Sequence, residues 1–414
     1  TFLDPACGSG HFLIEAFDLF YQMYEAEGKY TDPEAICKKI LSRNLYGIDI
    51  DERAVQIARA ALWMKAAERV IDFSGTPKNI IATNIRLPKG KDHLKVFLQK
   101  HPEDRLLQPA LESIFEGLEH ADELGSLLQI EEPVEKELRY LRERLGGQTT
   151  LSTGGLTGQT SFAGTMTDED WEAWKEGVVE RLADHFKEEG EAADLTSAFF
   201  SQNAGKGVRL FELLSKRYDV VAANPPYMHN RNMGKALKTY LGGQFQGANQ
   251  DLYAAFIVKC SHLAKDQHYF VMVSQQSFMF ISRYKKIREY ILDNSHIQLL
   301  AHIGPRGFQE IGGEKVNVAL IVFKKTKDNS LDSTFFKLVE YPYESKIHAL
   351  ISKKNPIIMN QSDFRIIPDN PFVYWIGKNF RSLFSKCEDF SKSAKVATRT
   401  KTANNDRYLR FFWE

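Results

Sequence analysis

The stretch that decides the fold is Thr1-Phe2-Leu3-Asp4-Pro5-Ala6-Cys7-Gly8-Ser9-Gly10. It predicts a short buried strand, Phe2–Asp4, followed by a tight glycine turn and the start of a helix. Glycine lacks Cβ and reaches positive φ, so a ligand can approach the backbone and the free N–H groups of the helix. The third glycine of a dinucleotide fingerprint and the lysine of a phosphate-binding loop are missing. A ligand with a carboxylate, such as S-adenosylmethionine, therefore fits better than NAD or ATP.

The alternation of strand and helix continues outward from this turn. Two segments, 1–88 and 211–330, switch between short apolar runs and amphipathic helical patterns. This spacing predicts a doubly wound, Rossmann-like α/β fold: a mostly parallel sheet with helices on both faces. The last two predicted strands are expected to pair antiparallel at one sheet edge. The predicted strands are Phe2–Asp4, Leu45–Ile50, Ile80–Thr83, Tyr218–Ala223, Tyr269–Val273, Gln298–Ile303 and Val316–Phe323, and the predicted helices are Gly10–Ala26, Arg53–Val70, Leu252–Ala264 and Tyr284–Asn294.

Two further segments complete the predicted organisation. Residues 89–210 are rich in Glu, Lys and Leu and predict a helical insertion, with a flexible Gly/Thr/Ser/Gln loop at 146–165 and a helical pattern over 168–189. We expect this insertion to form a packing or partner surface. Residues 331–414 are mixed and end in a basic, aromatic run, which indicates either DNA contact or a solvated face.

The composition is that of an ordinary globular protein. Its 414 residues suggest two or three domains, and the balance of 54 basic against 54 acidic residues gives no sign of a nucleic-acid partner. The four scattered cysteines predict reduced thiols in a cytoplasmic protein, with neither disulfides nor a metal site. No apolar run is long enough for a membrane span, and no signal peptide is visible. Because the chain opens inside a predicted strand, we expect it to be a fragment.

Polar side chains follow the second and third predicted strands. Asp49 is placed to accept hydrogen bonds from ribose hydroxyls of a nucleoside ligand, with Ile50 beside it. Asp51 is instead predicted to be the N-cap of the next helix. After the third strand, Asn84 is a candidate hydrogen-bond partner for the adenine of the cofactor and Ile85 a candidate apolar contact. A simple turn asparagine is the alternative for Asn84.

The clearest candidate for chemistry is Asn224-Pro225-Pro226-Tyr227, directly after a predicted strand. The prolines fix the backbone and remove two donors. An amino group between the Asn224 side-chain oxygen and the Pro225 carbonyl would have both protons directed and its lone pair turned toward an incoming methyl group. Tyr227 offers a flat face for an extruded base, and Phe308 is a candidate for the opposite face. A rigid turn and a core phenylalanine are the alternatives, but ligands bind at the carboxyl ends of strands in open α/β sheets.

With these residues in view, the chain resembles the amino-methyltransferases of DNA in which the cofactor motif precedes the catalytic motif. Residues 4–10 (DPACGSG) resemble their cofactor motif, 47–51 (GIDID) their acidic motif, and 224–227 (NPPY) the catalytic motif of adenine-N6 enzymes. The resemblance implies methyl transfer from S-adenosylmethionine to adenine N6 in double-stranded DNA, without a metal. The implied cofactor contacts are Asp4, Pro5, Ala6, Cys7, Gly8, Gly10, Asp49, Ile50, Asn84, Ile85 and Asn224.

A closer resemblance is to the PglX family of adenine methyltransferases from BREX phage-defence systems. It rests on the insertion before NPPY, on 245–253 (FQGANQDLY) and on 402–410 (TANNDRYLR). It implies methylation of a non-palindromic host site, other defence proteins as partners, and a target-recognition domain that begins within 331–414. In that family a further cofactor motif lies upstream of DPACGSG, and many relatives carry Asp where this chain has Asn84.

Two other functions stay open at this point. One is a DNA-binding or scaffold subunit that uses the methyltransferase fold as a sensor, and the complete NPPY motif speaks against a dead site. The other is methylation of glutamine in a protein, which related NPPY enzymes catalyse. The resemblance of the C-terminal part to a recognition domain favours DNA.

Overall fold

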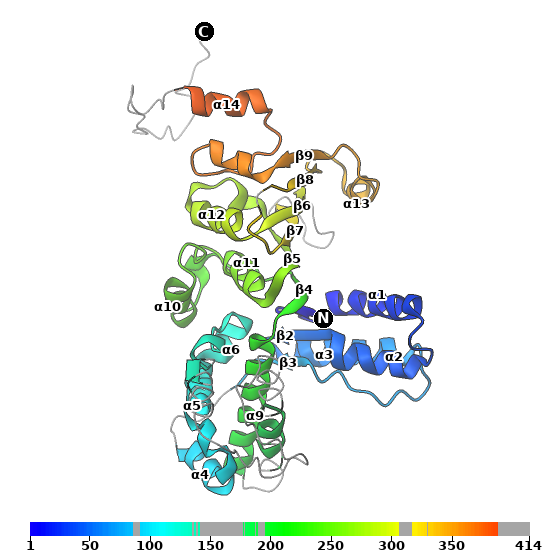
Figure 1. The fold of residues 1–414 in the computed structure, drawn as a ribbon, viewed down its shortest axis with the longest axis vertical. Helices are drawn as coiled ribbons and strands as arrows, with labels where there is room; N and C mark the ends of the chain where they lie inside the picture. Colours follow the sequence, from blue (N-terminus) through cyan, green and yellow to red (C-terminus); the bar gives the residue numbers. More distant parts are fainter. Residues whose placement is uncertain are drawn as a thin grey trace, which may run out of the picture.

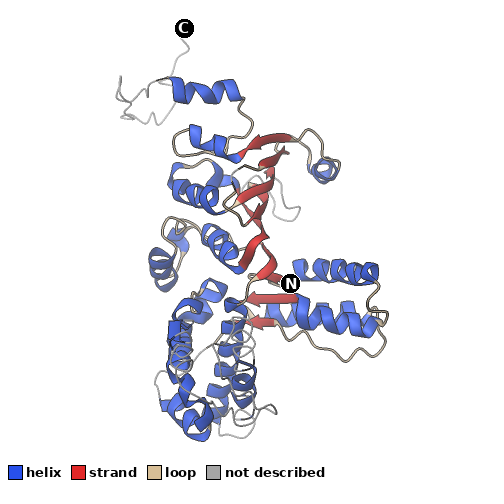
Figure 2. Cartoon of the chain, in the orientation of Figure 1, coloured by secondary structure: helices blue, strands red, loops and turns tan. Residues whose placement is uncertain are grey.

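A single mixed sheet organises the molecule (Figure 2). The computed structural model describes residues 1–85, 92–134, 195–305, 317–328 and 330–387, with scattered residues between 136 and 188. Within these residues the strand order is β3-β2-β1-β4-β5-β7-β6-β8-β9. The strands are β1 (Phe2–Asp4), β2 (Leu45–Asp49), β3 (Ile80–Ala82), β4 (Tyr218–Ala223), β5 (Ala264–Gln275), β6 (His296–Gly304), β7 (Val318–Lys324), β8 (Asp332–Lys337) and β9 (Ile357–Asn360).

The pairing confirms most of the predicted topology. Strands β3, β2, β1, β4 and β5 run parallel to one another, and β7 lies antiparallel between β5 and β6. The predicted antiparallel pair is therefore confirmed, but its position at the sheet edge is wrong. Strands β8 and β9 continue the sheet beyond β6, because β8 supplies Phe335 and Phe336, both buried, to the core.

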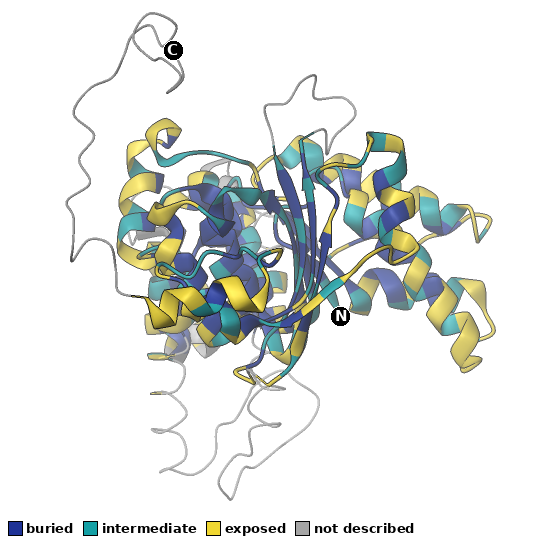
Figure 3. Cartoon of the chain, turned by 90° about the horizontal axis from the view of Figure 1, so that it is seen from above, coloured by how far each residue is buried: buried dark blue, intermediate teal, exposed yellow. Residues whose placement is uncertain are grey.

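Helices cover both faces of the sheet, which confirms the doubly wound α/β fold (Figure 1). Viewed along the sheet, buried residues are concentrated in the strands and in the helix faces that meet them (Figure 3). One face carries the N-terminal helices, and the other carries helices from segment 211–330. The first set is α1 (His11–Glu27), α2 (Pro33–Lys39) and α3 (Glu52–Ala67), and the second is α10 (Lys235–Gln244), α11 (Leu252–Leu263) and α12 (Lys285–Asn294).

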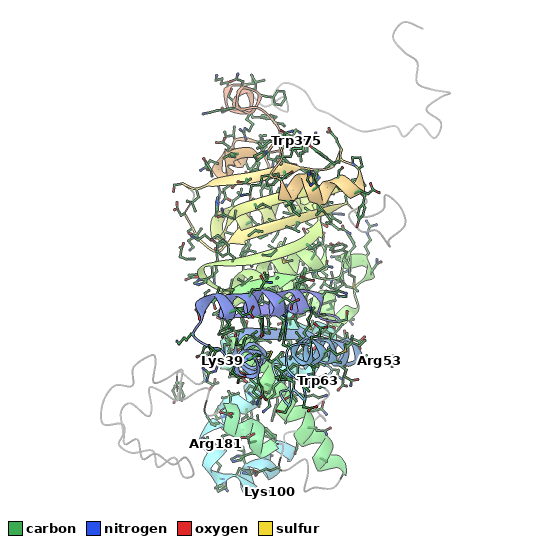
Figure 4. All side chains as sticks on the ribbon, turned by 90° about the vertical axis from the view of Figure 1, so that its right-hand side faces the viewer. Lys39, Arg53, Trp63, Lys100, Arg181 and Trp375 are labelled. Carbon is green, nitrogen blue, oxygen red and sulfur yellow. The ribbon has the colours of Figure 1, made fainter. Side chains whose placement is uncertain are left out.

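The predicted helical insertion enters between β3 and β4. Its helices α4 (Asp92–Lys100), α5 (Gln108–Gly117) and α9 (Leu195–Ser215) gather beyond the β3 edge, whereas α6 (Ala121–Leu124) lies beside α10 and the turn that follows it lies beside β2 (Figure 1). Figure 4 shows Lys100 and Arg181 of this insertion at the end of the long axis opposite Trp375. The predicted loop 146–165 and most of the helical pattern over 168–189 lie outside the described residues.

The C-terminal segment contributes β8, α13 (Tyr343–Ile351), β9 and α14 (Lys378–Lys386). Its strands thus belong to the same sheet as those of segments 1–88 and 211–330. The basic aromatic run, including 402–410, lies outside the described residues. The assignment of a target-recognition domain to this segment stays a prediction.

Candidate methyltransferase site

Four strands end at one edge of the sheet and carry the predicted site residues there. In the register, Asp4 lies opposite Gly47, Asp49 opposite Ala82, and Leu3 opposite Val221. Because β1, β2, β3 and β4 are parallel, their carboxyl ends meet at the same edge. The turn after β1, Asp49, the loop after β3 and the NPPY motif are therefore neighbours.

Main-chain hydrogen bonds shape the turn after β1. The Gly8 N–H donates to Asp49 Oδ2 at 2.8 Å, and the Cys7 N–H donates to the Ile48 carbonyl at 3.0 Å. The two glycines have different tasks. Gly8 has φ +50° and no described atom within 4 Å of an added Cβ, so its backbone faces open space. Gly10 has φ +90°, and a Cβ there would lie 2.9 Å from that of Ala58, so it permits α1 to approach α3.

Asp4 is a buried carboxyl group at the start of this turn. Its Oδ1 accepts a hydrogen bond from the Ala6 N–H at 3.0 Å, and burial raises its pKa to about 8. Within the described residues it forms no ion pair. The amino group of a bound amino-acid moiety would supply the missing positive charge. Cys7, by contrast, is buried with its sulfur in the core, where burial raises the thiol pKa, so its side chain does not face a ligand.

Asp49 links the first two strand ends. Its Oδ2 accepts from Gly8 and its Oδ1 accepts from the Asp51 N–H at 2.9 Å. Each carboxylate oxygen has a further lone pair, which leaves acceptors for ribose hydroxyls. Asp51 caps α3 by accepting from the Arg53 N–H at 2.9 Å, and its predicted N-cap role is confirmed.

The end of β3 presents unpaired acceptors. Asn84 Nδ2 donates to Glu52 Oε2 at 2.5 Å, and Lys206 in turn lies 3.2 Å from Glu52 Oε1. The Asn84 Oδ1 and Thr83 Oγ1 atoms are buried, with no hydrogen-bond partner among the described residues. An amide oxygen in this state suits the exocyclic amino group of an adenine. The hydrogen bond from Asn84 and the ion pair with Lys206 lower the pKa of Glu52.

The two candidate isoleucines differ in exposure. Ile50 is 51% exposed at the end of β2, whereas Ile85 is 2% exposed and packs in the main core. Ile50 therefore offers apolar surface at the ligand edge. The contact predicted for Ile85 stays a prediction.

The NPPY motif directly follows β4, and its polar residue is exposed. Asn224 and Pro226 are exposed, Pro225 is buried and Tyr227 is half-buried. The Tyr227 ring meets that of Tyr253 edge-on, with centroids 6.2 Å apart. Its hydroxyl is buried without a hydrogen-bond partner in the described part of the chain, and burial raises its pKa to about 12. Phe308, the candidate for the opposite face of a base, lies outside the described residues.

Backbone hydrogen bonds hold the chain after NPPY against the start of α11. The Leu252 N–H donates to the Met228 carbonyl at 3.0 Å, and the Asn230 N–H donates to the Gln250 carbonyl at 3.1 Å. His229 and Asp251 form a β-bridge between these bonds. The FQGANQDLY segment, which the sequence marked only by resemblance, thus braces the NPPY loop.

Sequence reasoning missed two residues at this edge and one buried lysine in α11. Glu52 holds Asn84, Ser126 Oγ donates to the Pro5 carbonyl at 2.5 Å, and Lys259 is fully buried in α11 beside Glu131. A lone lysine within the apolar pattern of 252–263 was a readable signal for a buried ion pair. Ser126 gave no such signal, because its partner lies 121 residues away in sequence.

The residues at this edge fit S-adenosylmethionine. The buried Asp4 carboxyl matches an amino group, and the acceptors of Asp49 match ribose hydroxyls. The unpaired Asn84 oxygen and exposed Ile50 match adenine, and Gly8 leaves open space beside them. In the described part of the chain, no group of three or more His, Cys, Asp or Glu side chains is placed to hold a metal ion. No described helix combines the length and apolar character that crossing a membrane requires.

The fold and this edge define the chain as a methyltransferase of the doubly wound α/β class. Residues 1–84 match a family described as "RMKL-like, methyltransferase domain". Residues 43–308 match the family described as "Eco57I restriction-modification methylase". The chain belongs to this Eco57I restriction-modification methylase family.

Two curated relatives confirm the closer resemblance. The chain is 30% identical over 391 residues to "Adenine-specific methyltransferase PglX" of Lacticaseibacillus casei (strain Zhang), covering 91% of this chain and 28% of the relative. It is 30% identical over 405 residues to "Adenine-specific methyltransferase BrxX" of Escherichia coli O9:H4 (strain HS), covering 93% of this chain and 30% of the relative. The chain thus spans less than a third of either relative.

Among solved structures, the chain is similar to the nuclease-deletion mutant of the Type ISP restriction-modification enzyme LlaGI in complex with a DNA substrate mimic. The TM-score is 0.49 at 12% sequence identity, over 92% of this chain and 25% of that chain.

Proposed function

We propose that this chain is the catalytic part of a site-specific DNA methyltransferase that transfers a methyl group from S-adenosylmethionine to adenine N6. We further propose that the whole protein marks host DNA in a BREX-like phage-defence system, together with other defence proteins. The second proposal is supported by the relatives named PglX and BrxX.

One observation carries the proposal: the NPPY loop and the glycine turn leave adjacent parallel strands at the same sheet edge. The exposed Asn224 side chain therefore lies next to the turn that would hold the methyl donor. Neither loop alone indicates a reaction, but together an acceptor-lined loop and an adjacent glycine turn support methyl transfer to an amine.

In the proposed mechanism the chain positions the amine. The Asn224 side-chain oxygen and the Pro225 carbonyl accept the two N6 hydrogens, which aims the nitrogen lone pair away from the ring. Tyr227 stacks on the extruded adenine, and Phe308 is proposed for the other side. The turn after β1 and Asp49 would hold S-adenosylmethionine, which would supply an electrophilic methyl group to N6; S-adenosylhomocysteine would be the leaving group, and the N6 proton would pass to solvent. The rate acceleration comes from fixed dipoles and from positioning of the amine, without a strong acid or base.

The test is the Asn224→Ala variant of the full-length protein, assayed with tritiated S-adenosylmethionine and DNA. We expect methylation to fall about 100-fold or more, as when one fixed polar contact to a reacting group is removed. Cofactor affinity, measured by calorimetry, should change little, since the glycine turn and Asp49 are intact. Wild-type-like turnover by this variant would overturn the catalytic assignment.

Parallel reactions identify the substrate. Incorporation of label into DNA, located at N6 of adenine by base-resolution mapping, supports the proposal. Label in a protein glutamine would replace DNA with protein as the substrate. A wild-type protein that binds DNA and transfers no label would point to a scaffold role.

A further inference from the structure

The helical insertion reaches into the cofactor edge through one short turn. The residues Gly125–Leu127 form a 3-10 turn at the end of α6 and are buried. Ser126 Oγ donates to the Pro5 carbonyl, within the turn after β1. A Cβ added at Gly125 would lie 2.6 Å from Ile50 Cγ2 and 3.6 Å from Thr83 Oγ1. This turn of the insertion thus lies against the first, second and third strand ends at once.

We propose that Gly125–Leu127 is a structural wall of the S-adenosylmethionine site, with Gly125 and Ser126 as positioning residues. The inference rests on the proposed function and assigns a task to an insertion that the sequence indicated only as a packing or partner surface. Gly125 sets the position of Ile50, and Ser126 sets the position of the Pro5 carbonyl.

Gly125 is suited to this task for two independent reasons. Its φ of +56° lies in a region that favours glycine. Its missing side chain leaves room for Ile50, a residue that follows β2 and is 51% exposed. Any larger residue would strain the turn and push Ile50 from its place.

Ser126 acts on the glycine turn through the main chain. It is 3% exposed, and its hydroxyl donates to the carbonyl of Pro5, which follows Asp4 in the turn. Without the hydroxyl this carbonyl would be left without that donor, and the turn would lose a restraint that comes from outside 1–85.

The same segment is anchored to the helices that follow NPPY in the chain. Lys259 Nζ, fully buried in α11, donates to the Leu128 carbonyl at 2.6 Å and to Glu131 Oε1 at 2.7 Å. The Gln129 N–H donates to the Tyr240 hydroxyl of α10 at 2.7 Å. Both partners follow NPPY in the chain. The segment 125–131 therefore holds the cofactor loop on one side and the helices behind NPPY on the other.

Calorimetric titration of the full-length protein with S-adenosylmethionine, and separately with S-adenosylhomocysteine, tests the proposal. We expect Gly125→Ala to raise Kd about tenfold and Ser126→Ala to raise it roughly threefold to tenfold, as loss of one hydrogen bond does. Gly243→Ala is the matched control, because an added Cβ in α10 meets no described atom within 4 Å. At saturating cofactor, kcat of both variants should stay within about threefold of wild type.

A double-variant cycle separates positioning from general damage. If Gly125 acts through Ile50, Gly125→Ala combined with Ile50→Ala should lose less affinity than the two single losses added together. Ser126→Thr, which keeps the hydroxyl, should recover affinity relative to Ser126→Ala. Melting temperatures without ligand show whether each variant is folded.

The outcomes distinguish the two proposals. A wild-type protein that binds no S-adenosylmethionine overturns the proposed function. If the wild type binds S-adenosylmethionine and the folded Gly125→Ala and Ser126→Ala variants bind it with the same Kd, only the inference about this turn is overturned. Strictly additive losses in the cycle would also overturn it, because they would separate Gly125 from Ile50.

Discussion

The turn after β1 and the loop after β4 are both held rigid at the sheet edge, but by different interactions. Both leave adjacent strands at one edge and must hold polar groups ready for a ligand. The first is held by hydrogen bonds, above all those accepted by Asp49. The second is held covalently by Pro225 and Pro226 and braced through Met228 and Leu252. The hydrogen-bonded turn has most of its own N–H groups already paired within the protein, whereas the proline loop removes N–H groups so that only acceptors would face an amine.

The largest effect should come from breaking the hydrogen-bonded turn. Asp49→Ala removes a charged acceptor from two main-chain N–H groups and from the predicted ribose contact. Since hydrogen bonds to a charged group contribute about 1.5–3 kcal/mol each, we expect cofactor affinity to fall about 100-fold or more by calorimetry. The control is Asp51→Ala, which removes a helix cap and should cost about 1 kcal/mol of stability. Equal losses of affinity in both variants would contradict the distinction between them.

A smaller effect is expected from loosening the proline loop. Pro226 is exposed, so Pro226→Ala removes little packing, but it frees residue 225 from the restriction that a following proline imposes. The Pro225 carbonyl would then be aimed less firmly. We expect kcat to fall roughly tenfold at saturating cofactor and DNA, while Kd for S-adenosylmethionine is unchanged. A change in Kd without a change in kcat would assign this loop to the cofactor instead.

The buried carboxyl of Asp4 gives the hydrogen-bonded turn a pH dependence. Its pKa is raised to about 8, so the ionised form is disfavoured in the folded state. Below about pH 4 the carboxyl is protonated in both states, and as pH rises toward 8 the wild type loses stability that Asp4→Asn keeps. Between pH 5 and 8 we expect the melting temperature of the wild type to drop by roughly 2–4 °C or more relative to the variant. Parallel melting profiles would contradict this, and bound S-adenosylmethionine should reduce the drop.

The smallest effect is expected at Tyr227, where it separates stacking from hydrogen bonding. The hydroxyl has no partner among the described residues, so Tyr227→Phe should be neutral or slightly stabilising. Because the ring is retained, kcat should stay within about threefold of wild type, measured by label transfer to DNA. Tyr227→Ala, which removes the ring, should lose far more. A strong loss in the phenylalanine variant would show that the hydroxyl takes part.

Local sequence patterns predicted most of the strands and helices, but few of the residues that hold the site residues in place. The strands β1 and β4 are predicted to the residue, since each is an apolar run that ends in turn residues. Strand β5 is longer than predicted, because α11 ends at Leu263 and β5 begins at Ala264 without intervening turn residues to mark the boundary. The sheet edge was misplaced, because apolar residues in β8 do not say which strand they join.

The site residues also differ in whether a local sequence pattern could identify them. Asp49 and NPPY stand out because their residue types occur at strand ends, where ligands bind. Glu52, Gly125 and Ser126 do not, because their importance depends on partners that are close only in space. Gly125 in particular looks like an ordinary helix terminator in the sequence.

The buried Lys259–Glu131 pair limits how this enzyme can be redesigned. An engineer who excised 89–210 as a detachable module, to obtain a smaller catalytic unit, would strip Lys259 of both of its acceptors. Removing one partner of a buried ion pair costs about 3–5 kcal/mol, a large part of the stability of a typical domain. A minimal version of the enzyme would have to retain 125–131 or replace Lys259 with an apolar side chain of similar length, such as methionine.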